Sequence, residues 1–354
     1  MTPMPVVTTP GPLAPLSHSP PQAGQGHTCS EAECGRQAGR GEPLSHSYGQ
    51  INRPALLPTR EGVGPSCIVL PENLGLWPTV IDFLAHRFPS ISREEVMARM
   101  QRGDVVDEMG AFISTERKYQ PHLKLFYYRS IAAEVRIPFD EVVLFQDDYL
   151  IAVDKPHFLP VTPGGRYLQE TLLVRLKRKY GIETLAPMHR IDRETAGVVL
   201  FTIQPSTRGA YQNLFSQRAI TKRYQAIAPF RADLKFPMTV RSRLVESEHF
   251  MRMREVDGEP NAETCIELLE ATNQHARYCL KPVTGKKHQL RVQMAALGIP
   301  ILNDQIYPEH RSKEQNESDD YTKPLQLLAA YIAFTDPISG EQRCFESQRR
   351  LDAL

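Results

Sequence analysis

The sequence lacks several features that mark specialised classes of protein. No stretch of its 354 residues approaches the roughly eighteen consecutive apolar residues of a membrane span. Its opening residues lack the basic segment and apolar run of a secretion signal. The six cysteines are too scattered to form a dense disulfide framework, so reduced thiols are predicted. These absences predict a cytoplasmic protein that can bury at least one full core.

The chain also has almost no net charge, which argues against a protein that coats nucleic acid by bulk attraction. The formal net charge is +1, so any nucleic-acid surface must be local. One local surplus of positive charge lies between Thr171 and Gln225, a segment with ten basic and three acidic residues. A solvated helix face and an RNA-binding surface both fit this surplus, and charge alone does not decide between them.

Recognisable metal-ligand spacing is absent as well. Cys29 and Cys34 lie near His27, but no second ligand pair follows at zinc spacing. His189 and His288 lack a third ligand at such a spacing. We therefore expect neither a metal nor a cofactor.

The chain divides into three predicted parts. Residues 1–65 are rich in Pro, Gly, Ser, His and Gln, which predicts a disordered leader. Residues 68–135 predict a small helical module. Its first helix carries apolar residues from Val80 to Phe88, and its second begins at a Ser92–Glu95 capping box with Val96, Met97 and Met100 facing inward. Short strands are predicted at 105–106, 112–113 and 123–128.

Residues 139–354 mix strands and helices without a regular repeat. A hairpin is predicted over 142–153, strands over 198–203 and 220–228, and helices over 172–180, 207–215 and 290–297. The helix over 207–215 is expected to bury Ala210, Tyr211, Leu214 and Phe215. The predicted fold class is α+β, with a mixed, largely antiparallel central sheet that is flanked by helices and contains a cleft.

The densest chemistry lies in the segment M-H-R-I-D-R-E-T-A-G-V-V-L-F. Asp192 stands between Arg190 and Arg193, just ahead of an apolar strand. Flanking positive charge favours the ionised form of a carboxylate. Taken alone, this pattern also fits a structural salt bridge in a loop.

Four ordered blocks resemble the RluA-like family of pseudouridine synthases. H-R-I-D-R-E-T-A-G is similar to its H-R-L-D-x-x-T-S-G signature, with Ile191 and Ala196 as departures. D-K-P-H-F-L-P-V-T-P-G-G, K-R-Y-Q-A, and T-G-K-K-H-Q-L-R-V-Q-M followed by G-I-P-I-L-N-D resemble its other elements. Leu328 stands where the family often has histidine. The module segment V-M-A-R-M-Q-R-G-D-V-V-D resembles the RNA-binding domain of a small-subunit ribosomal protein.

The resemblance implies catalytic roles for Asp192, Tyr224 and Arg291. Asp192 would act as nucleophile at the anomeric carbon or as base on the ribose. Arg291 would clamp the Asp192 carboxylate at two points, which lysine could not reproduce. Tyr224 would stack on the uracil or accept the proton from the ring carbon. No cofactor or metal is implied.

The implied partner is structured ribosomal or transfer RNA, whose target uridine must be flipped out of its stack. A monomer without membrane association is expected. Substrate-binding candidates are Arg190, Arg193, Thr195, Lys222, Lys286, His288 and Leu290. Further candidates for phosphate contact are Arg175, Lys177, Arg178, Lys179 and Lys287.

Two other functions fit parts of the pattern. A catalytically silent RNA-binding protein could keep the fold, although it would have no use for the Asp192, Tyr224 and Arg291 set. Hydrolysis of a glycosidic bond by paired carboxylates would need an acid partner near Asp192, and Glu194 is close in sequence. The resemblance favours isomerisation of uridine.

Overall fold

The computed structural model describes residues 57–72, 75–130, 134–248, 252–308 and 320–354. Most of the predicted leader, together with Cys29 and Cys34, lies outside the described residues. Residues 57–65 lie inside them and make defined contacts: Val63 is buried with Val174, and the Pro58 carbonyl accepts a hydrogen bond from the Tyr128 hydroxyl at 2.8 Å. The described structure therefore starts eight residues before the predicted leader ends.

A small module follows, in which two helices pack with a three-stranded sheet. Its core combines residues of both helices, such as Phe83 and Met100, with Leu125 of the central strand. The sheet has the order β1-β3-β2. The elements are β1 (Ser66–Val69), α1 (Val80–Arg87), α2 (Arg93–Gln101), β2 (Val105–Val106) and β3 (Lys124–Tyr127).

Local signals explain both helices, with two corrections to the sequence analysis. The full capping box lies at α1, where Thr79 and Asp82 exchange hydrogen bonds. At α2, Ser92 accepts the Glu95 amide as predicted, but the Glu95 carboxylate pairs with Arg99 at 2.8 Å. Met97 was predicted to face inward and is 37% exposed.

The strand predictions in this module were partly wrong. The pattern gave no indication of β1, and residues 112–113 form only an isolated bridge from Phe112 to Val106. The strand β1 has the sequence S-C-I-V, which does not alternate polar and apolar residues, so the pattern that indicates a half-buried strand is absent.

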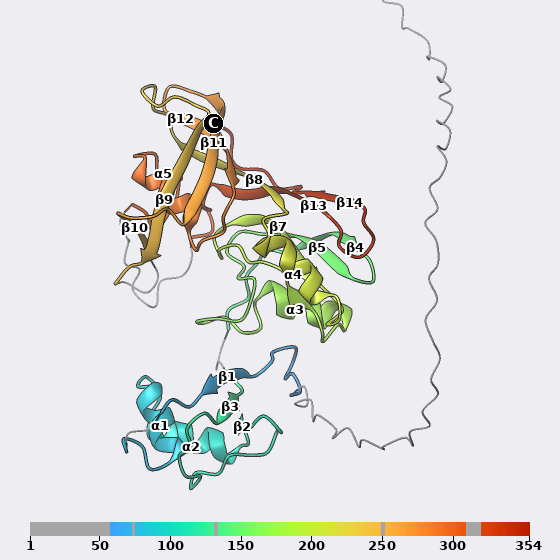
Figure 1. Ribbon diagram of the computed structural model, residues 1–354, viewed down its shortest axis with the longest axis vertical. Coiled ribbons are helices and arrows are strands. Elements are labelled where there is room, and N and C mark those ends of the chain that lie inside the picture. Colours follow the sequence, from blue (N-terminus) through green and yellow to red (C-terminus); the bar gives the residue numbers. More distant parts are fainter. Residues whose placement is uncertain (1–56, 73–74, 131–133, 249–251, 309–319) are drawn as a thin grey trace, which may run out of the picture. The chain divides into compact units, whose positions relative to one another are not determined.

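The larger part of the described chain is built on one mixed, largely antiparallel sheet of eleven strands (Figure 1). Nine follow the order β10-β9-β11-β12-β8-β13-β7-β5-β4, while β14 pairs with β13 and β6 with β7. Every strand pairing in the described residues is antiparallel except β7 with β13. The strands are β4 (Val142–Gln146), β5 (Leu150–Lys155), β6 (Ala186–Pro187), β7 (Ala196–Thr202), β8 (Thr221–Pro229), β9 (Met238–Glu246), β10 (Met253–Val256), β11 (Ala262–Ala271), β12 (His275–Pro282), β13 (Leu327–Thr335) and β14 (Gln342–Glu346).

Three helices accompany this sheet: α3 (Leu172–Tyr180), α4 (Arg208–Ser216) and α5 (Gln289–Ala296). The helix α3 ends as predicted at Tyr180, and Gly181 follows in the left-handed conformation that glycine favours at a helix end. In α4 only Tyr211 is fully buried, so the predicted burial of its other apolar residues was too strong. Figure 1 shows α5 beside β9 and β10, away from the other two helices.

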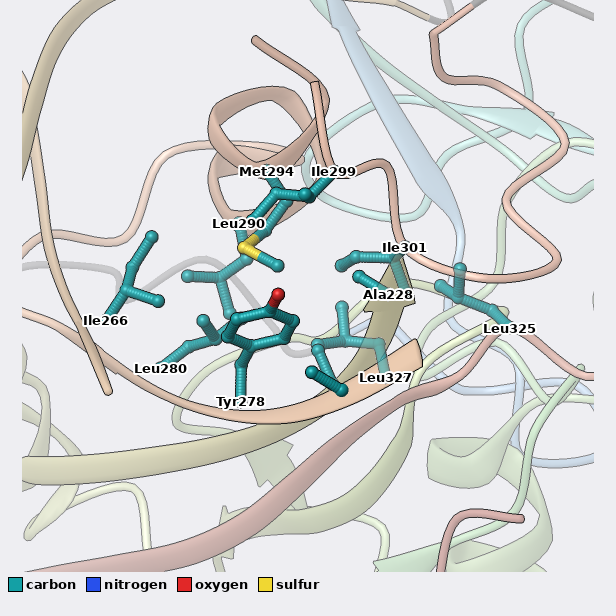
Figure 2. Close-up of a cluster of buried hydrophobic side chains, with 12 residues drawn as sticks. Ala228, Ile266, Tyr278, Leu280, Leu290, Met294, Ile299, Ile301, Leu325 and Leu327 are labelled. Atoms are coloured by element: carbon teal, nitrogen blue, oxygen red, sulfur yellow. The ribbon is translucent and has the colours of Figure 1, made fainter. Parts of the chain in front are cut away.

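A buried cluster fixes α5 on the sheet and thereby places the site. Leu290 and Met294 point from the helix toward Tyr278 and Leu280 of β12, as Figure 2 shows. Both helix residues are buried. Because Leu290 is anchored in this core, the side chain of the next residue, Arg291, leaves α5 at a fixed place.

The parallel contact between β7 and β13 explains the glycine that ends the central motif. Gly197 pairs with Ala329 and has a φ of 115°. A Cβ atom on Gly197 would lie 2.2 Å from the Ala329 carbonyl oxygen, far inside van der Waals contact. Only glycine lets the two strands approach here, directly after the loop that carries Asp192.

Candidate active site

The loop that carries Asp192 is held by three consecutive backbone carbonyls. The Asp192 carbonyl accepts the Thr195 amide at 3.1 Å, which closes a turn. The Arg193 carbonyl accepts Lys155 Nζ at 3.0 Å, and the Glu194 carbonyl accepts His157 Nδ1 at 2.6 Å. These contacts fix the backbone and leave the Asp192 side chain to other partners.

Lys155, the lysine of the K-P pair, has a structural role. Its side chain is fully buried, and Nζ also donates to the carbonyls of Pro156 at 2.9 Å and Leu159 at 2.7 Å. Burial lowers the pKa of Lys155 to about 7, against the opposing charges of Glu194 and Asp192. Three acceptors match the three N–H bonds of an ammonium group, so Lys155 ties β5 to the Asp192 loop.

His189, the first residue of H-R-I-D, is a structural histidine. Its Nε2 accepts the Leu200 amide at 3.2 Å, and its ring lies 5.1 Å from that of Phe215. Burial, with a smaller effect of the Lys222 charge, lowers the pKa of His189 to about 3. Burial also lowers the pKa of His157 to about 4. Both imidazoles are therefore neutral in the folded protein at pH 7.

These two histidines predict a loss of stability on acidification. In the unfolded chain an imidazole gains its proton near pH 6.5. In the folded protein His157 and His189 stay neutral until the pH falls to about 4 and about 3. The unfolded state thus binds more protons at pH 5, and the free energy of unfolding should fall from pH 7 to pH 5 by about 2 kcal/mol per histidine. Urea unfolding at both pH values measures the change. A double variant, His157→Gln with His189→Gln, should lose clearly less, and an equal loss in both proteins would contradict the assignment.

Arg291 connects Asp192 to a second carboxylate. Its side chain is only 1% exposed, and Nη1 lies 3.0 Å from Asp192 Oδ2. Nε and Nη2 lie 2.8 and 2.7 Å from the two oxygens of Asp304. The predicted pairing with Asp192 is present in the structure, but the predicted two-point clamp was placed on the wrong residue: it holds Asp304.

The side chain of Asp304 is as deeply buried as that of Arg291, and both of its oxygens accept hydrogen bonds. Its Oδ1 also accepts the amides of Ile306 at 2.8 Å and Tyr307 at 3.1 Å. Burial alone would lower the pKa of Arg291, but Asp304, Asp192 and Glu194 outweigh it and raise that pKa. Sequence reasoning noted Asp304 only as the end of G-I-P-I-L-N-D. The signal that could have singled it out is that a buried arginine needs counter-charge.

A pocket of about 100 Å³ opens beside Asp192. Tyr224 and Lys222 enter it from β8, where alternation places both on the same face of the strand. Nine of the ten predicted site residues line the pocket: Arg190, Asp192, Thr195, Lys222, Tyr224, Lys286, His288, Leu290 and Arg291. The lining residues that sequence reasoning missed are Ile191, Pro282, Thr284, Gly285, Gln289 and Leu327.

Comparison with known proteins identifies the family of this chain. Residues 149–296 match the family model described as RNA pseudouridylate synthase. The dual-specificity RNA pseudouridine synthase RluA of Haemophilus influenzae is 31% identical over 210 residues, which span 58% of this chain and 92% of that relative. This chain belongs to the RluA-like family of RNA pseudouridine synthases. It is therefore an enzyme, an RNA pseudouridine synthase.

Other relatives are more distant or match a smaller part. Human pseudouridylate synthase RPUSD2 is 31% identical over 170 residues, covering 47% of this chain and 30% of its own length. The solved structure of human RNA pseudouridylate synthase domain containing 4 is 27% identical with a TM-score of 0.45, covering 59% of this chain and 88% of that one.

Arg193 is the predicted site residue that does not line the pocket of this pseudouridine synthase. Its guanidinium donates to Glu194 Oε1 at 3.0 Å and to the Tyr167 hydroxyl at 2.7 Å. Arg190 and Arg193 were expected to hold the Asp192 carboxylate between them, but the arginine that contacts it is Arg291. Arg193 instead neutralises the neighbouring glutamate.

Two basic residues proposed as phosphate anchors are also internal. Arg175 is paired with Glu170 and Glu141 and hydrogen-bonded to backbone carbonyls. Lys177 is 9% exposed, and burial lowers its pKa. Part of the basic surplus between Thr171 and Gln225 thus serves the fold rather than an RNA surface.

Glu194 does not fit the acid of a glycosidase pair. Burial alone would raise its pKa, but the charges of Arg193 and Arg291 outweigh burial and leave the pKa below its ordinary value. Such a carboxyl is ionised at neutral pH and has no proton to give. Asp192 and Glu194, which both lie near Arg291, therefore do not form the acid and base pair of a glycosidase.

A larger cavity of about 410 Å³ lies in the small module, lined by residues such as Phe88, Arg99 and Tyr127. None of the predicted site residues contributes to it. We place the active site at the smaller pocket because the buried, coupled charges converge there, and such groups mark catalytic sites better than volume does.

Three further observations concern the described residues. Cys67, Cys265, Cys279 and Cys344 are free thiols, as predicted. No helix among the described residues is long and apolar enough to cross a membrane. In the same part of the chain, no group of three or more His, Cys, Asp or Glu side chains is arranged to hold a metal ion.

Proposed function

We propose that this enzyme isomerises uridine in ribosomal or transfer RNA with Asp192 as its active carboxylate. The observation that carries the proposal is the charge arrangement at the pocket wall. Arg291 is held at two points by Asp304, and its remaining nitrogen contacts Oδ2 of Asp192. This leaves Oδ1 of Asp192 as the oxygen available to a substrate.

The reaction breaks the bond from ribose C1′ to uracil N1, turns the base and joins C1′ to uracil C5. Asp192 could attack C1′ as a nucleophile or take a proton from the ribose as a base, and both roles use the charged carboxylate. The positive charge of Arg291 complements it in a largely buried setting. No external energy source is required.

Tyr224 is best suited to hold the uracil. Burial, with the nearby Asp192 charge, raises the pKa of its phenol. The ring is therefore neutral at neutral pH, which suits stacking on a base and disfavours proton abstraction by a phenolate. Of the two roles implied by the resemblance, we propose stacking.

Lys222 is the strongest candidate for a phosphate contact. It lines the pocket, its Nζ donates to the Thr284 carbonyl at 3.2 Å, and burial lowers its pKa. A phosphate oxygen would offset the cost of burying this charge. Lys286 and Arg190 also line the pocket and would extend the positively charged surface that binds the RNA backbone.

A direct test uses purified protein and RNA labelled with tritium at uracil C5. Because C5 gives up its hydrogen when it joins the ribose, each isomerisation releases one tritium to water. Ribosomal and transfer RNA are supplied separately. We expect release from at least one of them, limited to a fixed number of uridines per molecule. No release from either RNA would contradict the proposed substrate class.

The small module is proposed to anchor RNA by phosphate contact through Arg93, Arg99 and Arg102. Removing residues 1–56 should leave melting temperature and turnover almost unchanged, because that segment has few apolar residues. Removing residues 1–134 should weaken RNA binding and reduce its salt dependence, while Asp192 chemistry stays measurable at high RNA concentration. Dissociation constants at several salt concentrations provide the measurement.

A charge variant separates this effect from any misfolding of the shortened chain. In the full chain, Arg93→Gln with Arg102→Gln removes two exposed arginines, whose acidic partners Asp82 and Asp104 are partly buried. We expect the same direction of change, with a smaller salt slope. Unchanged affinity and salt slope in both proteins would show that the module is not an RNA anchor.

A further inference from the structure

His288 occupies a strained position beside the reactive oxygen of Asp192. It precedes α5 with a φ of 54°, a left-handed conformation that costs energy for a residue other than glycine. Its side chain is 9% exposed, and Nε2 lies 3.8 Å from Asp192 Oδ1. Arg291 occupies the other oxygen, so His288 faces the one left for chemistry.

A hydrogen-bond chain determines which ring nitrogen of His288 carries the proton. The Tyr307 oxygen accepts the Met253 amide at 2.8 Å and lies 3.0 Å from His288 Nδ1. Among the described residues, Nδ1 is the acceptor that the Tyr307 hydroxyl reaches. Tyr307 therefore donates to Nδ1, and a neutral imidazole must then carry its proton on Nε2.

The neutral state follows from burial, which lowers the pKa of His288 despite the opposing charge of Asp192. Tyr307 is itself fixed, because its backbone amide donates to Asp304. The segment from Asp304 to Tyr307 thus positions two groups around Asp192: Arg291 through a carboxylate and His288 through a hydroxyl.

We propose that His288 donates a hydrogen bond from its Nε2–H to the uracil as the bond between C1′ and N1 breaks. In that step the bonding electron pair stays with the base, so negative charge develops on N1 and O2. The Nε2–H of His288, held beside Asp192 Oδ1, stabilises this negative charge. The Asp192 carboxylate stabilises the positive charge that develops on the ribose. No proton is transferred. This inference rests on the proposed function, and it assigns His288 a catalytic role besides lining the pocket.

The kinetic test compares His288→Leu with His288→Gln in the full chain. Leucine removes the donor, whereas glutamine offers an amide N–H near the position of Nε2. We expect single-turnover tritium release to fall about 100-fold in His288→Leu and to recover to within about 10-fold in His288→Gln, as for other donors to developing negative charge. The dissociation constant for RNA and the melting temperature should change little in either. A normal rate in His288→Leu, or equal losses in both variants, would overturn the proposal.

A spectroscopic test is independent of activity. Nitrogen NMR of the ¹⁵N-histidine-labelled protein should show His288 with a proton on Nε2 and none on Nδ1 at pH 7, its signals being assigned by their loss in His288→Gln. In Tyr307→Phe this preference should weaken, and tritium release should slow. A proton on Nδ1, or a doubly protonated ring, would overturn the proposal. If the unaltered enzyme releases no tritium, the proposed function fails instead, whatever the tautomer.

Discussion

Asp192→Asn should slow tritium release by about three orders of magnitude or more, which corresponds to about 4 kcal/mol in the activation barrier. The amide keeps the shape of the side chain but cannot attack C1′ or take a proton from ribose. Arg291 keeps its two-point contact with Asp304, so its buried charge remains compensated. The melting temperature and the dissociation constant for RNA should therefore stay close to those of the unaltered protein.

A matched control makes the same chemical change at the surface. Asp233→Asn alters a carboxylate that pairs with Arg231 on the exterior. Its release rate should equal that of the unaltered enzyme. Retained turnover in Asp192→Asn would remove Asp192 from catalysis, and an equal loss in Asp233→Asn would show that the assay reports something other than the site.

The second large effect is expected for Arg291→Lys. The arginine donates hydrogen bonds to two carboxylates through three nitrogens, and a single ammonium cannot reproduce that geometry. We expect tritium release to fall by at least about 100-fold, because Asp192 loses its fixed partner. The free energy of unfolding should also fall, by up to about 3 kcal/mol, since Asp304 is left in the interior with poorer pairing.

Urea unfolding and single-turnover rates, measured below the melting temperature, separate these two effects. The matched variant is Arg231→Lys, which alters an exposed pair with Asp233 and should change neither quantity measurably. A near-normal rate in Arg291→Lys would mean that the contact with Asp192 is not needed for the reaction.

Elements with strong local signals could be predicted from the sequence. The helix at 172–180 has an apolar face and a glycine at its end, and the hairpin of β4 and β5 has a polar turn. The strands β9 to β12 were not predicted, because their pattern depends on cross-strand partners. In β11 a bulge lies between Leu268 and Glu270, and Glu270 pairs with Arg277 of β12 at 2.6 Å. Charged residues in such strands show no clear alternation until the register is known.

The same distinction applies to the site. Motif resemblance identified Asp192, Tyr224 and Arg291, and all three line one pocket. The partner that clamps Arg291 was not predicted. A buried arginine needs counter-charge, but Asp304 lies in a loop without periodic spacing, so the pattern does not indicate which carboxylate supplies it. The contact of Tyr307 with His288 likewise exists only once β10 and α5 lie side by side. The sequence motifs identified the residues proposed to react, whereas the residues that orient them become visible only in the tertiary structure.

The central claim is that Asp192 converts uridine to pseudouridine in structured RNA. Chemical mapping of pseudouridine at single-nucleotide resolution tests it most directly, on unmodified ribosomal and transfer RNA incubated with the full chain or with Asp192→Asn. We predict new pseudouridine at a small set of defined positions with the full chain and none with Asp192→Asn. The same positions modified by both proteins, or no position modified by the full chain, would contradict the claim.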